Sequence, residues 1–235
     1  MDGSPDRPRQ EPRQRWRLVA RRSADAPPLT QRELAEAWES AVLECGLPVA
    51  WTDAATPRLR LSFAAPLPLG VAGEAELIDM FLTERLPTWR VREALDGRLP
   101  AGWALVDLYD VWPAGPALAG RVVAAEYRME LAAAAGDATT VAAAAARMMS
   151  AAELPRERLK GGGTVRYNLR PLIDELAVVE HGPPVVIRAR TRFDPELGTG
   201  RPDEVLAALA DAAGAPLEAT AIVRERLILA DDLAS

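Results

Sequence analysis

Two stretches of the chain place arginine at alternate positions, and these arginines have the clearest binding chemistry in the sequence. Residues 57–64 alternate between apolar and polar side chains, and the polar positions are Arg58, Arg60 and Ser62. A second polar series consists of Arg166, Asn168 and Arg170. Alternate residues of a strand share one face, and guanidinium groups bind phosphates in a bidentate manner or stack on bases. The six residues are therefore candidate contacts for RNA or another anionic ligand. The alternative is a solvated sheet face, or ion pairs with the acidic residues, which number 34 against 28 basic ones.

No residue pattern identifies a catalytic centre. Cys45 is the only cysteine and falls on an apolar helical stripe, so it is expected in the core and not as a nucleophile. His181 is the only histidine and lies in a predicted turn, where an exposed histidine without a catalytic role is expected. One thiol cannot supply the ligands of an iron–sulfur cluster. The sequence thus predicts no catalytic residue, no metal and no cofactor, and it favours a non-enzymatic role without settling the point.

Three charged or glycine-rich segments each allow two interpretations. Glu74, Glu76 and Asp79 lie on or beside a predicted strand, and a solvated edge is favoured over a metal site. Gly161–Gly163 is favoured as a flexible loop over an anion-binding nest. Residues 1–13 are rich in proline and charge, which predicts a disordered leader. Its arginines could contact a polyanion, but a solvated tail is favoured.

The elements that must position these residues follow from hydrophobic periodicity. The first half predicts strands at 15–21, 59–64, 73–83 and 103–112. Thr30 and Glu33 form a capping box for a helix whose apolar stripe reaches Cys45, and Trp89 to Leu95 predicts a second, short helix. In the basic strand, Leu59, Leu61 and Phe63 are expected to be buried. Pro113 to Gly120 reads as a linker.

The same order recurs in the second half. Strands are predicted at 123–131, 185–191 and 221–229, and a strand at 165–179 is interrupted at Pro171. Asp137 caps an alanine-rich helix from Ala138 to about Ala152, whose alanines either pack closely or face a partner. Pro155 to Gly163 is predicted to be a loop. A last helix begins at Pro202 and ends at Gly214.

These elements predict an α+β protein of two tandem ferredoxin-like β-α-β-β-α-β units. The predicted domains are the leader at 1–13, a first unit at 14–113 and a second at 121–230. An apolar fraction of 49% is sufficient for a packed core. The net charge of −6 argues against a general nucleic-acid coat. Neither a signal peptide nor a membrane span is recognisable, so a cytoplasmic protein with no membrane contact is expected.

The stretch from Thr56 to Val71, which contains Pro57-Arg58-Leu59-Arg60-Leu61 and Pro66-Leu67-Pro68-Leu69-Gly70, resembles the signature of the radical-SAM-linked family. That bacterial family is a domain of unknown function whose members occur alone or joined to radical SAM proteins. Cys45 to Ala50, Val165 to Ile173 and Gly200 to Leu206 resemble further parts of it. The chain departs from the family at Pro28 to Leu34, which lacks a histidine, and at Trp51 to Pro57.

The resemblance implies a radical SAM protein as partner. The expected function is a non-catalytic accessory or substrate-recognition protein that acts with a radical SAM enzyme in RNA modification or metabolism. RNA is expected because ferredoxin-like folds often bind it and because of the arginine series. Two alternatives remain open: an RNA-processing or RNA-modifying enzyme on a doubled ferredoxin-like frame, and a protein-interaction scaffold.

Overall fold

The computed structural model describes residues 11–132, 137–160 and 163–233. Most of the predicted leader, including Arg7 and Arg9, and Gly161 and Gly162 of the glycine loop lie outside these residues. The chain forms two compact units. Unit 1 is Met1–Pro66 with Ala75–Arg121, and unit 2 is Leu67–Glu74 with Val122–Ser235. Nothing in the residue pattern predicts that Leu67–Glu74 belongs to the second unit.

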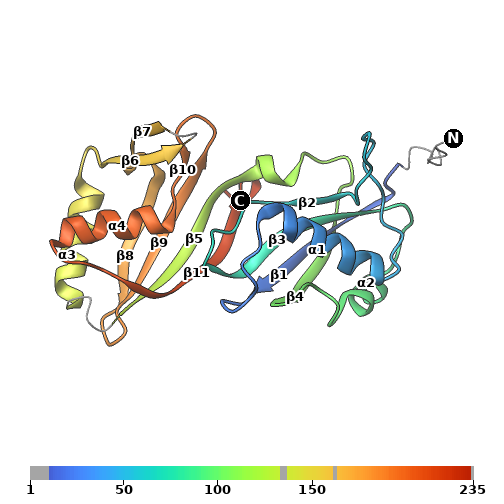
Figure 1. Cartoon of the computed structure of the whole chain (residues 1–235), viewed down its shortest axis with the longest axis horizontal. Helices are drawn as coiled ribbons and strands as arrows, with labels where there is room; N and C mark the ends of the chain where they lie inside the picture. Colours follow the sequence, from blue (N-terminus) through green and yellow to red (C-terminus); the bar gives the residue numbers. More distant parts are fainter. Residues whose placement is uncertain (1–10, 133–136, 161–162, 234–235) are drawn as a thin grey trace. The chain divides into compact units, whose positions relative to one another are not determined.

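Unit 1 has the element order β-α-β-β-α-β and contains β1 Gln14–Arg22, α1 Gln31–Glu44, β2 Leu61–Phe63, β3 Ala72–Leu82, α2 Thr88–Leu95 and β4 Trp103–Val111. Its strands lie in the order β2-β3-β1-β4. The pairs β1–β4 and β2–β3 are antiparallel. Figure 1 draws α1 and α2 in front of these strands. The loop after β4 ends in the 3-10 helix Leu118–Arg121.

Local sequence explains where the first helix begins and ends. The Thr30 hydroxyl accepts the Glu33 N–H, and the Glu33 carboxylate accepts the Thr30 N–H, so the predicted capping box is formed. Gly46, with φ 65°, follows the helix in the left-handed region, which glycine adopts readily. α2 starts at Thr88 without a side-chain cap. Trp89, predicted as part of its apolar stripe, is instead 65% exposed.

One apolar cluster joins α1 and α2 to the facing side of β1 and β3 and includes Trp16, Leu18, Trp38, Val42, Ile78, Met80, Val91 and Leu95. Trp38 packs edge-on against Phe63 and Trp103, with ring centroids 6.1 and 5.4 Å away. Leu61 and Phe63 are only half-buried, contrary to the prediction, whereas Leu59 is buried. The reason is that β2 has three residues and pairs only with β3.

Unit 2 contains β5 Val122–Leu131, α3 Ala138–Ser150, β6 Pro155–Lys160, β7 Gly163–Asn168, β8 Ile173–Glu180, β9 Val186–Asp194, β10 Gly198–Thr199, α4 Pro202–Ala213 and β11 Ala219–Leu229. The antiparallel pairs β11–β5, β5–β9 and β8–β9 build its sheet. Ala72 and Gly73, from the part of β3 that belongs to unit 2, pair in parallel with β11. The chain is therefore an α+β protein, as predicted, with three more strands in unit 2 than expected.

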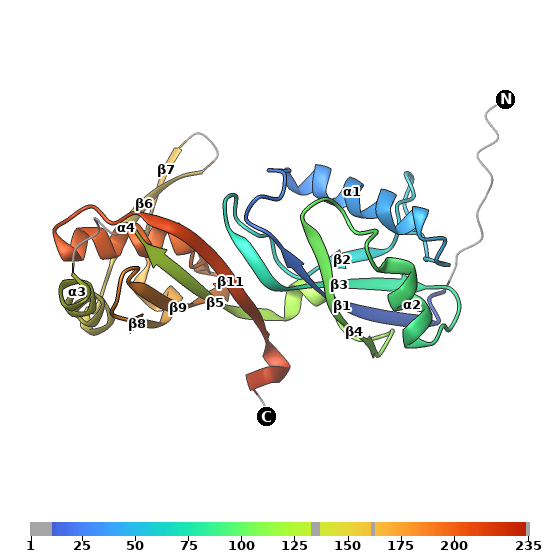
Figure 2. The same ribbon diagram turned by 90° about the horizontal axis from the view of Figure 1, so that it is seen from below.

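The prediction of a loop from Pro155 to Gly163 was wrong. Residues 155–160 form β6, which pairs with β7 as an antiparallel hairpin in which Arg156 faces Tyr167 and Glu157 faces Arg166 (Figure 2). Alternation is present here, but it alternates between charged residues, so a search for apolar periodicity misses it. The interruption near Pro171 was correct, because the 3-10 helix Arg170–Leu172 separates β7 from β8.

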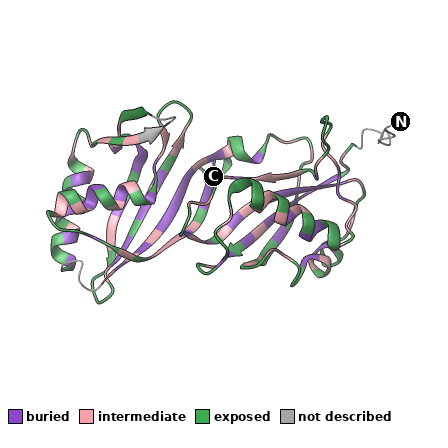
Figure 3. Cartoon of the chain, in the orientation of Figure 1, coloured by how far each residue is buried: buried purple, intermediate pink, exposed green. Residues whose placement is uncertain are grey.

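One side of α3 faces the core of unit 2, and the other side, with Ala143 and Ala146, is exposed. Ala144, Ala145 and Met148 are buried in a cluster with residues of β5, β8, β9 and α4. Figure 3 shows buried residues along the strands and on the inner sides of the helices. Close packing is therefore correct for the buried alanines of this helix. No helix of the described segments is long and apolar enough to cross a membrane.

Gly102 is required where the chain enters β4. Its φ is 78°, and a Cβ at this position would lie 2.4 Å from the Cβ of Ala26. We expect Gly102→Ala to lower the free energy of unfolding by about 2–4 kcal/mol, through backbone strain and the clash together. Gly97→Ala is the matched control, because Gly97 has φ 67° but open space around it, and strain alone costs about 1 kcal/mol. Urea unfolding measures both, and equal losses would contradict the steric argument.

Candidate functional site

The first arginine series does not form one cationic row. Arg58 Nε lies 2.8 Å from Oε1 of Glu39 on α1, so its charge is compensated. Arg60 is exposed, and its guanidinium carbon lies 4.3 Å from the centre of the Phe81 ring. Ser62 is half-buried and pairs with Asp79 across β2 and β3. Arg58 therefore has a carboxylate partner among the described residues, whereas Arg60 has none.

The second series is mostly structural. Arg166 on β7 forms an exposed ion pair with Glu157 at 2.6 Å. The Asn168 side-chain oxygen accepts the backbone N–H groups of Leu154 and Arg170 at 2.8 and 3.0 Å. Arg170 lies beyond β7 in the 3-10 helix and donates to the carbonyls of Met149 and Ile173. The expectation of a shared strand face was therefore wrong, because the chain turns before Arg170.

The strongest polar interaction of unit 1 is buried. Asp79 is 0% exposed and accepts hydrogen bonds from Arg15 Nε at 2.8 Å and from Arg17 Nε at 2.8 Å, with further bonds from the Nη2 atoms. The interpretation of Asp79 as part of a solvated edge was therefore wrong, and Glu76 is also buried. Burial disfavours the charge of Arg17, but the hydrogen bond and charge of Asp79, with a smaller contribution from Tyr109, raise the pKa of Arg17 above its usual value.

Arg15 also holds the segment that follows β4. Its Nη1 donates to the carbonyl of Gly115 at 3.0 Å, and its Nη2 donates to the carbonyl of Pro116 at 2.9 Å. On its other side, the guanidinium of Arg15 lies 5.1 Å from the centre of the Phe81 ring, which places Phe81 in contact with both Arg15 and Arg60. Arg15 and Arg17 thus form the internal framework of unit 1 and are not available to a ligand.

A network of ion pairs, larger than the Asp79 group of unit 1, covers one face of the sheet in unit 2. Glu126 accepts from Arg190 Nε at 3.0 Å and from Arg226 Nε at 2.6 Å. Its hydrogen bond with Arg226, followed by that with Arg190, outweighs burial and lowers the pKa of Glu126 to about 2. Further pairs on this face join Arg128 to Glu130, Arg188 to Glu225 and Arg192 to Asp174.

These pairs leave little positive charge for a polyanion. By sequence, unit 2 carries 13 basic and 18 acidic residues, a net charge of −5. A hollow of about 470 Å³ beside the β6–β7 hairpin is lined by Pro155, Arg156, Glu157 and Arg166. Its two arginines are paired, with Asp211 and Glu157. Phosphate affinity requires uncompensated cations, so the described arginines of unit 2 are poorly suited to bind RNA.

Two groups that could act as nucleophile or base, the Cys45 thiol and the Tyr167 hydroxyl, are held in their neutral forms. The Cys45 thiol is half-buried against the apolar cluster and donates to the Ala41 carbonyl at 3.1 Å. Burial raises the pKa of this thiol, which favours its unreactive form. His181 is exposed in the turn between β8 and β9, as expected. Burial, and then Glu204, raise the pKa of the Tyr167 hydroxyl, which stays protonated at neutral pH.

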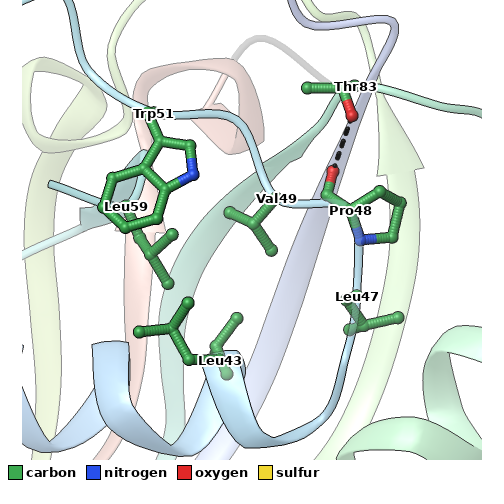
Figure 4. Close-up of a pocket in the computed structure, with 8 residues that line it drawn as sticks. Leu43, Leu47, Pro48, Val49, Trp51, Leu59 and Thr83 are labelled. Atoms are coloured by element: carbon green, nitrogen blue, oxygen red, sulfur yellow. Dashed lines mark hydrogen bonds between the residues drawn. The ribbon is translucent and has the colours of Figure 1, made fainter. Parts of the chain in front are cut away.

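Unit 1 has an open apolar pocket of about 310 Å³ (Figure 4), lined by Val42, Leu43, Leu47, Pro48, Val49, Trp51, Leu59 and Thr83. Leu43, near the end of α1, is 53% exposed. The close-up shows two polar side-chain groups, the Thr83 hydroxyl and the indole N–H of Trp51. The Thr83 hydroxyl donates to the Pro48 carbonyl at 3.1 Å. Sequence reasoning missed this site. The available signal was Leu43, an apolar residue of the helix that lies off the stripe of Leu34, Trp38, Val42 and Cys45.

Comparisons with known proteins give one family and a distant structural likeness. Residues 15–202 match the family described as "Uncharacterized protein conserved in bacteria (DUF2344)". No curated protein matches the chain significantly. A solved structure titled "Crystal Structure of a Cbf5-Nop10-Gar1 Complex" aligns with TM-score 0.47 and 11% identity, over 89% of this chain and 49% of the other. The present chain thus spans about half the length of that one.

Removal of the Asp79 charge tests the buried framework. We expect Asp79→Asn to lower the free energy of unfolding by about 3–5 kcal/mol, because it leaves two buried guanidinium groups without a counter-charge. Glu36→Gln is the control: Glu36 pairs with Arg32 on the exposed side of α1, where such a pair contributes about 0.3–0.5 kcal/mol. Chemical denaturation compares the two. A loss below about 1 kcal/mol for Asp79→Asn would contradict the role assigned to Asp79.

Acid stability tests the Glu126 network. The pKa of Glu126 is lower in the folded chain than in the unfolded chain, so its contribution to stability is complete above about pH 4.3 and is lost as pH falls through about 2. We expect Glu126→Gln to cost about 1–2 kcal/mol at pH 6 and much less at pH 2. Glu157→Gln, at an exposed pair, is the control and should change little at either pH. A pH-independent cost of Glu126→Gln would contradict the assignment.

Proposed function

We propose that this chain, which belongs to the bacterial DUF2344 family, is a non-catalytic accessory protein that binds a protein partner. The resemblance of Thr56 to Val71 to the radical-SAM-linked signature supports a radical SAM enzyme as that partner. The radical chemistry would belong to the partner, since a single cysteine cannot hold an iron–sulfur cluster.

The open apolar pocket of unit 1 is the observation that carries this proposal. Its lining comes from the end of α1, from residues 47–51, from Leu59 and from Thr83. Leu47 to Val49 and Leu59 fall in stretches that resemble the family, whereas Trp51 lies where the chain departs from it. Exposed apolar surface with this concave form is typical of sites for ligands or protein partners. The arginines of the two series, by contrast, are largely occupied by internal carboxylates and carbonyls, with Arg60 as the exception. The balance of free surface chemistry therefore favours a protein partner over a nucleic acid.

We also propose that each unit is a ferredoxin-like fold. In unit 1 the order β-α-β-β-α-β with strands arranged β2-β3-β1-β4 supports this assignment. In unit 2 the arrangement β8-β9-β5-β11 supports it, with the β6–β7 hairpin and β10 as additions. A ferredoxin-like fold does not by itself indicate a particular function.

The proposal is tested by purifying the tagged full-length chain from the bacterium that encodes it. Bound proteins are identified by quantitative mass spectrometry, and bound RNA is measured in the same eluate. We expect a radical SAM protein to be enriched in near-equal amount, and re-expression of the two chains together to reproduce the complex. Enrichment of RNA with no protein partner, or catalytic turnover by the isolated chain, would contradict the proposal.

A second candidate function is RNA contact in support of the partner, and among the six candidate residues Arg60 alone favours it. If the complex binds single-stranded RNA, we expect Arg60→Ala to weaken binding and to reduce the log–log salt slope by about one. Arg166→Ala is the control, because Arg166 is exposed but already paired with Glu157. Equal RNA affinity and salt slope for wild type and Arg60→Ala, measured by filter binding at several salt concentrations, would exclude Arg60 as a contact.

A further inference from the structure

We infer that the pocket of unit 1 binds one bulky apolar side chain of a partner segment that carries basic residues beside it. This inference rests on the proposed function and deepens it, because it names the site and the chemistry of the bound segment. The bound side chain would lie in this pocket, whose lining includes Leu43, Trp51 and Leu59.

The lining decides what can enter the pocket. Six of the eight lining residues have purely apolar side chains, and the two polar side-chain groups are the Thr83 hydroxyl, which donates to the Pro48 carbonyl, and the indole N–H of Trp51. A metabolite with several polar groups would lose more hydration there than these two groups could replace, which is unfavourable. An aliphatic or aromatic side chain has no hydrogen-bonded water to lose, and its transfer from water into the pocket is favourable. A cavity of about 310 Å³ has room for one such side chain.

The charges around the pocket favour one sign of charge for the partner residues that flank the bound apolar side chain. Of the four glutamates of α1, Glu33 caps the start of the helix, and Glu36 and Glu39 pair with Arg32 and Arg58, so the charge that remains lies at Glu44. The last turn of α1 has no basic residue. Glu44, next to Leu43, is exposed and makes no ion pair within the described parts of the chain. The carboxyl end of a helix is itself negative. Lysine or arginine beside the apolar side chain would therefore meet favourable charge, whereas an acidic residue would be repelled.

The same charges explain why a segment of protein fits better than a lipid or a nucleic acid. A fatty acid would bring its carboxylate to the negative end of α1, and RNA would bring phosphates there. A basic peptide avoids both conflicts. Its backbone also provides polar groups that help to orient it, because the side chains of the pocket supply few.

The test uses the full-length chain and three capped peptides in one Gly/Ser frame, with Arg-Leu-Arg, Glu-Leu-Glu or Arg-Ser-Arg at the centre. Titrations are followed by ¹⁵N–¹H NMR. We expect Arg-Leu-Arg to shift resonances of residues 42–51 and 59 and to bind at least about tenfold more tightly than either other peptide. Leu43→Arg should abolish these shifts. Leu197→Arg is the matched control, since Leu197 of unit 2 is 50% exposed against 53% for Leu43.

The outcomes separate the site from the proposed function. Equal binding of Arg-Leu-Arg and Glu-Leu-Glu, shifts elsewhere on the chain, or unchanged binding by Leu43→Arg would each overturn the inference. If Leu43→Arg still co-purifies with the radical SAM protein as wild type does, the pocket is not the partner's site, although the proposed function stands. Peptide binding at the pocket without any radical SAM partner would support the site and contradict the proposed function.

Discussion

Asp79 lies at the centre of unit 1, between two arginines of the neighbouring strand. Its carboxylate accepts four hydrogen bonds from Arg15 and Arg17, and none of the three side chains is more than 4% exposed. A buried carboxylate without these donors would be strongly destabilising, and so would either arginine without the carboxylate. The group therefore fixes β1 against β3, and Arg15 extends the constraint to the carbonyls of Gly115 and Pro116.

Many arginines of this chain bind carboxylates or carbonyls of the chain itself, so a high arginine content does not indicate phosphate binding here. An arginine-rich strand suggests phosphate binding, yet Arg58 pairs with Glu39, Arg166 with Glu157, and Arg170 with main-chain carbonyls. The sheet of unit 2 repeats the pattern around Glu126. Unit 1 also has an accessible apolar pocket beside the carboxyl end of α1, next to the exposed Glu44. The proposal of a protein partner rests on this pocket and on the internal pairing of these arginines.

Most helices and strands could be predicted because their signals are local. The capping box at Thr30, the glycine at Gly214 and the alternation of β1 and β5 each act within a few residues. The site could not be predicted in the same way. Whether Arg58 faces solvent or Glu39, and whether Asp79 faces water or Arg15, depends on strand order and register, which residues far apart in the sequence determine. The β6–β7 hairpin was missed because its alternation is between charged residues.

Hydrogen exchange of the full-length chain, alone and in complex with the protein partner recovered by co-purification, tests the central claim most directly. The claim is that a protein partner is bound at the apolar pocket and not through the arginines. It predicts slower amide exchange in residues 41–51 and 58–60 on complex formation, and unchanged exchange in β5 and β9, where the ionic network is already complete. Protection confined to β5 and β9, with residues 41–51 unaffected, would contradict it.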